Sequence, residues 1–202
     1  MRQDTLERLD HRNPLVVDTR ELGRRPGSMR RETRDVPAPA DMSIEVIGVP
    51  EGAPLQLELR LEAVMEGVLV SGAAEVPLAG ECVRCLDPLE RELRVDFQEL
   101  YVYPDRGAEE GADEDAPRLV GDLLDLEPVL RDAVVLALPL TPLCRETCGG
   151  LCLECGARLD DDPGHSHETA DPRWAALQGL FGGPTAEADD NGAHRVDENQ
   201  EK

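Results

Sequence analysis

Hydrophobic and polar residues alternate along much of the first half of the chain. Between residues 55 and 62 every second residue is a leucine, and charged or amide side chains stand between the leucines. This is the period-two pattern of a half-buried β-strand. Residues 65–67 supply a turn, residues 68–78 return with one apolar face, and apolar residues of one parity mark a further long strand over 89–103. The pattern predicts a small twisted antiparallel sheet or open barrel.

Shorter strands are predicted on either side of this set. Residues 14–19 are short and apolar, and residues 43–49 alternate loosely. Residues 14–104 as a whole are therefore expected to be β-rich. Gly72, in the middle of the returning strand, predicts a bulge or a sharp bend at that point.

The periodicity changes in the second half of the chain. Residues 104–120 are largely acidic, rich in glycine and without a repeat, which indicates a flexible surface loop. An i, i+3, i+4, i+7 pattern of apolar residues then predicts one amphipathic helix over residues 123–139, ended by Pro139. A shorter helix is predicted over residues 171–182, with an apolar face made of Trp174, Leu177 and Phe181.

Together these elements describe an α+β protein with a single domain over residues 14–183. Mainly antiparallel strands come first, and the amphipathic helix follows. A loop over residues 141–170, which holds cysteines and histidines, leads to the short C-terminal helix. Residues 1–13 are expected to be flexible, and the polar, acidic residues 184–202 are expected to be disordered.

The net charge of −22 on 202 residues limits what the chain is expected to bind. Phosphates are repelled by such a protein, which excludes a factor that coats nucleic acid without specificity. The charge is uneven, however, because residues 20–34 contain six arginines and two glutamates. This segment is either a solvated loop or a contact surface for RNA or an acidic partner. Its arginines are Arg20, Arg24, Arg25, Arg30, Arg31 and Arg34.

The six cysteines carry the most specific chemistry in the sequence. Residues 1–12 lack the apolar core of a signal peptide, and no apolar run is long enough to span a membrane. We therefore expect a cytoplasmic protein, in which paired cysteines are more often metal ligands or redox thiols than disulfides. The cysteines form close groups followed by two histidines, so the candidate ligands are Cys82, Cys85, Cys144, Cys148, Cys152, Cys155, His165 and His167.

Eight ligands are enough for two structural zinc ions, because a tetrahedral site commonly takes two pairs from separated segments. In one partition the first zinc takes Cys82, Cys85, Cys144 and Cys148, and the second takes Cys152, Cys155, His165 and His167. In the other, Cys82 and Cys85 pair with Cys152 and Cys155, which leaves Cys144 and Cys148 free. We prefer the first partition because it leaves no ligand unexplained.

Catalytic interpretations of these residues fit less well. A dithiol oxidoreductase would place a low-pKa cysteine at a helix N-terminus, whereas Cys82 and Cys85 lie between two predicted strands. A zinc deaminase would place a histidine before its paired cysteines, whereas here both histidines follow them. No nucleophile elbow, phosphate-binding glycine loop or H-E-x-x-H motif is present. Nothing in the sequence requires an enzyme.

Several motifs, taken together, are similar to those of a known family. They are D-T-R-E-L-G-R-R-P-G-S at 18–28, C-V-R-C-L at 82–86, A-L-P at 137–139, P-L-C at 142–144, C-G-G-L-C-L-E-C-G at 148–156 and D-P-R-W at 171–174. With them the chain resembles, over residues 14–181, the YceD-like family of large ribosomal RNA subunit accumulation proteins. His165 and His167 stand where that family commonly has a C-x-C. The replacement keeps ligand capacity and favours metal binding over disulfide chemistry.

The resemblance implies a cytoplasmic, non-catalytic factor for the synthesis, processing or stability of large-subunit (23S) ribosomal RNA. Under this hypothesis two zinc ions hold the shape and the arginines of residues 20–34 contact the RNA. The partners are ribosomal RNA, ribosomal proteins or assembly factors, with no membrane and no small-molecule substrate. A second hypothesis is an adaptor whose acidic surface docks a basic ribosomal protein without touching RNA. A third is a dithiol oxidoreductase.

Overall fold

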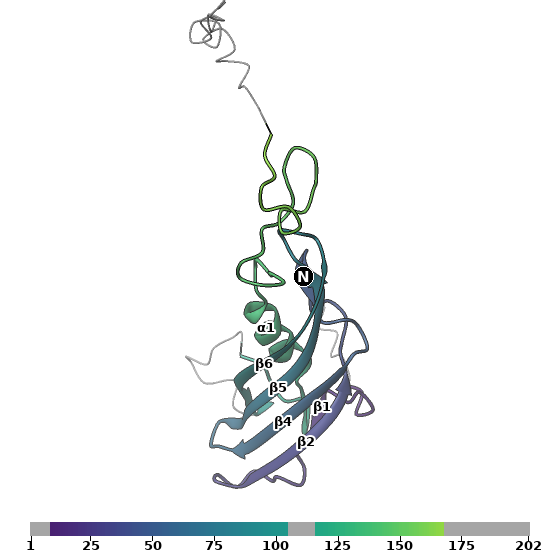
Figure 1. Ribbon diagram of the computed structural model, residues 1–202. Helices are drawn as coiled ribbons and strands as arrows, with labels where there is room; N and C mark the ends of the chain where they lie inside the picture. The colour runs from purple at the N-terminus through teal and green to yellow at the C-terminus, as the bar shows by residue number, and fades with distance from the viewer. Residues whose placement is uncertain (1–8, 105–115, 168–202) are drawn as a thin grey trace, which may run out of the picture. The chain divides into compact units, whose positions relative to one another are not determined.

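The computed structural model describes residues 9–104 and 116–167, and the chain divides into two compact units, Met1–Pro163 and Gly164–Lys202. The first unit holds every helix and strand assigned to the described residues (Figure 1). They are β1 (Val16–Asp18), β2 (Met29–Pro37), β3 (Ile47–Gly48), β4 (Pro54–Ala63), β5 (Gly67–Glu81), β6 (Pro88–Val102), β7 (Leu123–Asp125) and α1 (Glu127–Ala137). The predicted α+β class with mainly antiparallel strands is confirmed. The helix predicted over 171–182 and the tail 184–202 lie outside the described residues.

The central strand of the main sheet is β5. Along its whole length one edge of β5 pairs with β6, from Gly67↔Val102 to Glu81↔Pro88. The other edge pairs first with β4 and then, opposite residues 79–80, with the short β3. β2 pairs with the far edge of β4, and β1 and β7 form a separate two-stranded sheet. Among the described strands this order does not close on itself, so the structure is an open sheet and not a closed barrel.

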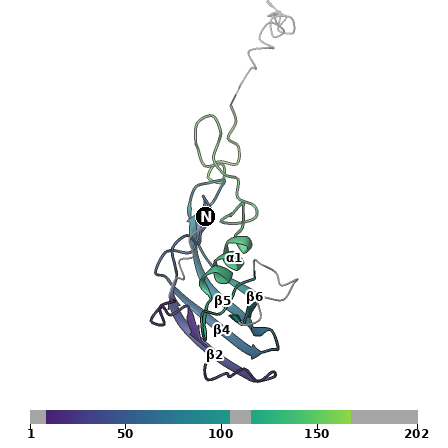
Figure 2. The ribbon, with the colours of Figure 1, turned by 180° about the vertical axis from the view of Figure 1, so that it is seen from behind.

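The period-two pattern of β4, β5 and β6 places their leucines and valines on one face of the sheet. Leu57, Leu61 and Val70 on this face are completely buried. α1 packs against β6 on the same core, where Leu130 and Val134 are also completely buried (Figures 1 and 2). The opposite face of the sheet is polar and has an open hollow over β2, β4, β5 and β6.

The predicted amphipathic helix is present but begins later than residue 123. Residues Leu123–Asp125 are instead extended, because they form β7 and pair with β1. The Asp125 carboxylate then accepts a hydrogen bond from the backbone N–H of Glu127 at 3.0 Å, in the first turn of α1. The helix ends at Ala137, since Leu138 precedes a proline and adopts an extended conformation. No helix of the described residues has the length and apolar character needed to cross a membrane.

The bulge expected at Gly72 is absent. The pairing continues without interruption on both sides, with Leu59 and Phe97 opposite Gly72. A Cβ atom added at residue 72 would lie only 2.4 Å from Cζ of Phe97. The glycine is therefore needed because the Phe97 ring lies over the backbone of the central strand, and a side chain there would force the ring out of the core.

Two other stretches differ from the sequence expectation. Much of the arginine-rich segment is not a loop, because residues 29–37 form the nine-residue edge strand β2. The strand predicted over 43–49 is reduced to β3, since a tight turn, closed by the N–H of Ile44 donating to the carbonyl of Ile47, occupies its first half. In the predicted loop over 104–120, Leu119 is buried in the core and residues 105–115 lie outside the described residues.

Candidate metal centre

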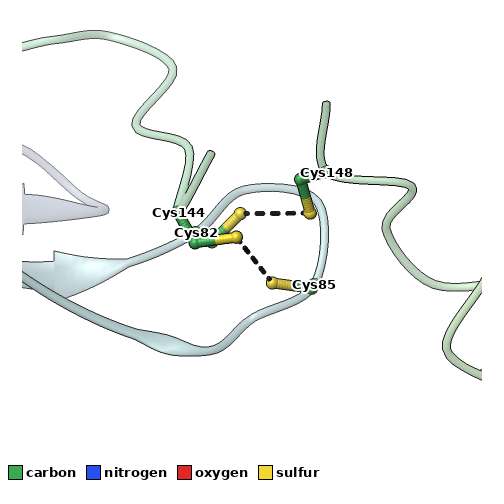
Figure 3. A group of neighbouring side chains, drawn as sticks. All are labelled: Cys82, Cys85, Cys144 and Cys148. Atoms are coloured by element: carbon green, nitrogen blue, oxygen red, sulfur yellow. Dashed lines mark hydrogen bonds between the residues drawn. The ribbon is translucent and has the colours of Figure 1, made fainter. Parts of the chain in front are cut away.

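Four cysteines from two separate segments meet at the end of the β5–β6 hairpin. Cys82 and Cys85 lie in the loop between β5 and β6, and Cys144 and Cys148 lie in the segment after α1. The sulfur of Cys82 is 3.9 Å from that of Cys148, and the sulfur of Cys85 is 3.7 Å from that of Cys144. All four sulfurs lie within 4.8 Å of one another and point toward a common centre (Figure 3).

These distances fit a tetrahedral metal site better than disulfides. A zinc ion with four Zn–S bonds of about 2.3 Å places its sulfurs about 3.8 Å apart, whereas a disulfide joins two sulfurs at about 2.05 Å. Four thiolates are also the donor set of structural zinc sites, in which every coordination position is filled by protein. The group therefore has both the geometry and the chemistry of a closed metal site.

Hydrogen bonds in the backbone fix the Cys82–Cys85 loop in a tight turn. The N–H of Leu86 donates to the carbonyl of Cys82 at 2.8 Å, and the N–H of Cys82 donates to the carbonyl of Asp87 at 2.9 Å. The turn requires a left-handed conformation at Leu86, with φ of +60°. Such a turn directs backbone N–H groups toward the cysteine sulfurs, as a metal-binding knuckle requires.

The second C-x-x-C repeats this turn. The N–H of Gly156 donates to the carbonyl of Cys152, and the N–H of Cys152 donates to the carbonyl of Ala157, both at 2.8 Å. Gly156, which corresponds to Leu86, has φ of +71°. Both cysteine pairs are therefore held in the same knuckle conformation, although their neighbouring elements differ.

Burial and hydrogen bonding act in opposite directions on the thiols of the first group. Burial by itself raises the pKa of the Cys82 thiol, but backbone N–H groups of Cys85, Cys144 and Arg84 outweigh it and lower the pKa to about 6. At Cys85 a backbone N–H from Asp87 lowers the pKa, but burial and the neighbouring thiols together raise it to about 12. In the metal-free state the four thiols therefore do not all ionise together, because the negative charge of one thiolate disfavours ionisation of its neighbours. A divalent cation would remove that repulsion.

The segment after Cys148 is tied to the first knuckle by its own contacts. Nη1 of Arg158 donates to a carboxylate oxygen of Asp87 at 2.7 Å, and the other Asp87 oxygen also pairs with Arg158. Nη1 of Arg84 donates to the carbonyl of Cys148 at 2.9 Å, and the N–H of Leu151 donates to the carbonyl of Arg84 at 3.0 Å. The hydrogen bond from Arg158 is the main reason that the pKa of Asp87 falls to about 2. The cysteine spacing did not predict this link.

The second predicted ligand set is divided between the two units. Cys152 and Cys155 belong to the first unit, and His165 and His167 belong to the other. Within the first unit, Cys152 is half-buried and Cys155 is exposed. In the other unit, Nε2 of His165 and Nε2 of His167 are 2.8 Å apart, with the two rings edge to face. The two histidines are thus close enough to bind one ion as alternate residues, which is the local geometry that a His-x-His chelate needs.

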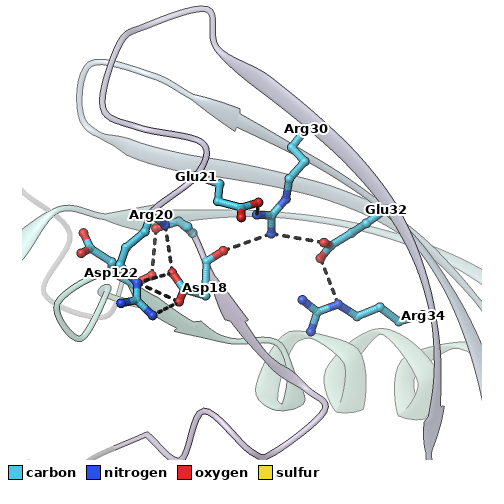
Figure 4. A network of polar contacts seen from close by, with 8 residues as sticks. Asp18, Arg20, Glu21, Arg30, Glu32, Arg34 and Asp122 are labelled. Carbon is cyan, nitrogen blue, oxygen red and sulfur yellow. Dashed lines mark hydrogen bonds and ion pairs between the residues drawn. The ribbon is translucent and has the colours of Figure 1, made fainter.

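The structure pairs four of the six predicted RNA-binding arginines with acidic residues, and Figure 4 shows three of them, Arg20, Arg30 and Arg34. Arg30 and Arg34 point to the inward face of β2 and share Glu32, at 3.2 and 3.0 Å. The other two pairs are Arg20 with Asp18 and Arg24 with Asp122. Among the described residues, Arg25 and Arg31 are exposed and lack an acidic partner.

The strand register adds a basic residue that sequence reasoning missed. Arg31 of β2 lies directly opposite Arg60 of β4, and both line the hollow on the polar face of the sheet. Like charges in directly opposed positions are unfavourable unless something compensates them. Here the carboxylate of Glu62 pairs with Arg60 at 2.7 Å, whereas Arg31 lacks an acidic partner among the described residues. The alternation of β4 already placed Arg60 on the polar face, but its pairing with Arg31 follows only once β2 is known to be a strand.

Comparison with known proteins identifies the family. The model of the family described as "Large ribosomal RNA subunit accumulation protein YceD" matches residues 70–181. Uncharacterized proteins of Mycobacterium bovis and Mycobacterium tuberculosis are each 46% identical over 171 residues, which cover 84% of this chain and 83% of theirs. An uncharacterized protein of Mycobacterium leprae is 41% identical over 170 residues, 84% of this chain and 78% of its own. No solved structure matches the chain. The chain belongs to the YceD family of large ribosomal RNA subunit accumulation proteins.

Proposed function

We propose that this protein is a non-enzymatic, cytoplasmic factor that supports the synthesis, processing or stability of large-subunit ribosomal RNA. The observation that carries the proposal is the closed group of four cysteines in a chain of the YceD family. With all four positions of a tetrahedral ion filled by sulfur, no position remains for a substrate. The metal would then hold the shape, and the function would lie on the surfaces around it.

We propose zinc as the metal of the first group, because four thiolates are soft ligands that select zinc in a tetrahedral site. For the second group we propose a second zinc, bound by Cys152, Cys155, His165 and His167. The support here is proximity in the chain, since His165 follows Cys155 by ten residues. The knuckle conformation of Cys152–Cys155 and the closeness of the histidine rings suit the same role.

For contact with RNA we propose the Arg31–Arg60 pair. Phosphate contacts need cations whose charge is not already neutralised. Of the six arginines in residues 20–34, Arg25 and Arg31 meet this condition among the described residues. Arg31 also faces a second arginine in an open hollow, Arg60, which itself pairs with Glu62 at 2.7 Å. A phosphate bound by Arg31 would also attract Arg60, which would exchange Glu62 for the phosphate.

The alternative of a dithiol oxidoreductase has less support. A redox cysteine must be accessible as well as easily ionised. Cys82, the thiol with the lowered pKa, is completely buried. One observation supports the adaptor hypothesis. The end of the first unit that holds the four cysteines has acidic and exposed apolar side chains, which suit a basic protein partner.

The proposed function is tested in cells that depend on a plasmid copy of the gene. We expect depletion of the protein to lower large-subunit ribosomal RNA relative to small-subunit ribosomal RNA, measured by quantitative RNA analysis. A plasmid copy with Arg31→Gln and Arg60→Gln should restore the ratio only in part. The matched control, Arg20→Gln, changes an arginine that pairs with Asp18 and does not line the hollow, and it should restore the ratio fully. An unchanged ratio after depletion would contradict the function, and full restoration by the double variant would contradict the RNA contact alone.

A further inference from the structure

Exposed aliphatic side chains gather around the two knuckles. Val83, Leu86, Leu140 and Leu153 are 38%, 59%, 81% and 102% exposed, and we call these four residues the knuckle patch. Their segments are joined by backbone hydrogen bonds. The N–H of Val83 donates to the carbonyl of Pro142, and the N–H of Leu151 donates to the carbonyl of Arg84, each at 3.0 Å. The four residues therefore belong to one end of the first unit and are not scattered over it.

Leu86 is an unexpected residue in its position. Its φ of +60° is in the left-handed region, which disfavours residues with a branched or bulky side chain. The second knuckle has glycine at the equivalent position, Gly156. A leucine that is both strained and 59% exposed contributes little to the core of this protein. A leucine at this position is explained if a partner covers the side chain.

The charges around the knuckle patch indicate the kind of partner. Residues 80–91 and 139–163 carry eight carboxylates and four arginines. Two of those arginines, Arg145 and Arg158, already pair with Asp160 and Asp87. A filled four-thiolate zinc site would add further negative charge. The apolar residues therefore lie in a surface of net negative charge.

We propose that the knuckle patch docks a basic protein of the large ribosomal subunit, through apolar side chains flanked by lysine or arginine. Nucleic acid fits this surface poorly. Single-stranded RNA is bound by stacking on aromatic or guanidinium groups within a positive surface. The knuckle patch instead offers aliphatic side chains and repels phosphates. The proposal rests on the proposed function only for the choice of the large subunit as the source of the partner.

The docking surface is tested with the full-length, zinc-loaded chain. Individually purified basic proteins of the large ribosomal subunit, freed of RNA, serve as the probes. The test variant is Leu86→Asn with Leu153→Ser, because asparagine tolerates the left-handed conformation and both residues are exposed. The control is Met65→Ser, which changes a residue whose exposure of 66% is close to that of Leu86 and which lies beyond the opposite end of β5. That end lies about 45 Å away along the strand.

We expect at least one of these proteins to bind and the double variant to weaken that binding at least tenfold. Met65→Ser should leave it within twofold, and added salt should weaken binding of the wild type. Unchanged metal content and circular dichroism of the double variant show that any loss is not caused by unfolding.

Three outcomes would overturn the proposal. One is the absence of the predicted difference, either because no basic protein binds or because the double variant binds one as tightly as the wild type does. Another is that the double variant loses binding to protein-free large-subunit RNA instead. The third is a shift of the fluorescence of Trp174, the single tryptophan, in the free double variant, because residues near Trp174 would then be the occupant. A fall in large-subunit RNA on depletion would stand in all three cases, so the two proposals can fail separately.

Discussion

Asp18 and Arg20 illustrate how this chain uses arginine for local structure. The backbone N–H of Arg20 donates to one carboxylate oxygen of Asp18 at 2.9 Å, and Nε of Arg20 donates to the other at 2.9 Å. The side-chain hydrogen bonds, followed by the backbone one, lower the pKa of Asp18 to about 2, although burial opposes them. The carbonyl of Asp18 also accepts a hydrogen bond from Arg30 of β2. The ion pair thus orders the chain at the end of β1, and the hydrogen bond from Arg30 ties β1 to β2.

This ion pair predicts a pH dependence. The carboxyl of Asp18 has a pKa of about 2 in the folded chain and about 3.9 in an unfolded one, so the carboxylate stabilises the fold above about pH 4. That contribution is lost as the pH falls toward 2. Urea unfolding should therefore show wild type more stable than Asp18→Asn near neutral pH, with the difference shrinking between about pH 4 and pH 2. In an Arg20→Gln background the difference should be much smaller. A difference that grows on acidification would contradict this account.

Among the secondary structure elements, α1 connects the sheet to the second pair of cysteines of the candidate metal site. Its buried face packs on β6, and the chain reaches Cys144 only seven residues after the helix ends at Ala137. Two hydrogen bonds to carbonyls of this connection, from Val83 to Pro142 and from Arg91 to Leu143, hold it beside the hairpin. The packing of α1 therefore determines where one pair of cysteines meets the other.

Loosening α1 should weaken both the fold and the metal site. Leu130→Ala removes a completely buried side chain and should cost about 2–5 kcal/mol in the free energy of unfolding. Leu136→Ala removes a side chain on the same helix that is 85% exposed, and should change it by no more than about 0.5 kcal/mol. Denaturant titration measures both. Release of metal to a chelator should be faster in Leu130→Ala than in Leu136→Ala. Equal effects of the two substitutions would show that α1 does not act as the support.

The elements that the sequence predicted well are those whose apolar residues repeat. Alternating leucines identified β4, and the i, i+4 spacing of Leu130 and Val134 identified α1. β2 was missed because its inward positions hold Arg30, Glu32 and Arg34. Those charges are tolerated on the inward face because they pair with each other and because Arg34 donates to carbonyls of the chain near β1. No rule based on apolar periodicity can find such a strand.

The candidate site was predictable in its ligands and less so in its surroundings. The two-residue spacing of Cys82 and Cys85 predicted a knuckle, because a tight turn brings two such sulfurs to one centre. The link between Asp87 and Arg158 joins residues 71 positions apart in sequence, and it depends on the folded path of the chain. The Arg31–Arg60 pair was hidden for the same reason, since it exists only through the register of β2 with β4.

Considered as a whole, the first unit has four candidate metal ligands at one end of a long hairpin and its proposed RNA contact on the polar face of the sheet. The metal end is acidic with exposed aliphatic residues, and the polar face holds the Arg31–Arg60 pair. Because the two surfaces are separate, a chain with a net charge of −22 could bind RNA through one surface and a basic protein through the other. With zinc bound as proposed, the four cysteines would pin the hairpin to the segment after α1 and so hold both surfaces in place.

The mass of the intact full-length chain, purified under reducing conditions and measured by native mass spectrometry, shows directly whether metal ions are bound. We predict bound zinc, with one ion held by Cys82, Cys85, Cys144 and Cys148 and a second by the other four ligands. Cys82→Ser with Cys85→Ser should lose one ion and keep the other. Less than about one zinc per chain, or a mass lowered by the hydrogens lost in two disulfides, would contradict the central claim that a metal ion holds the four cysteines together.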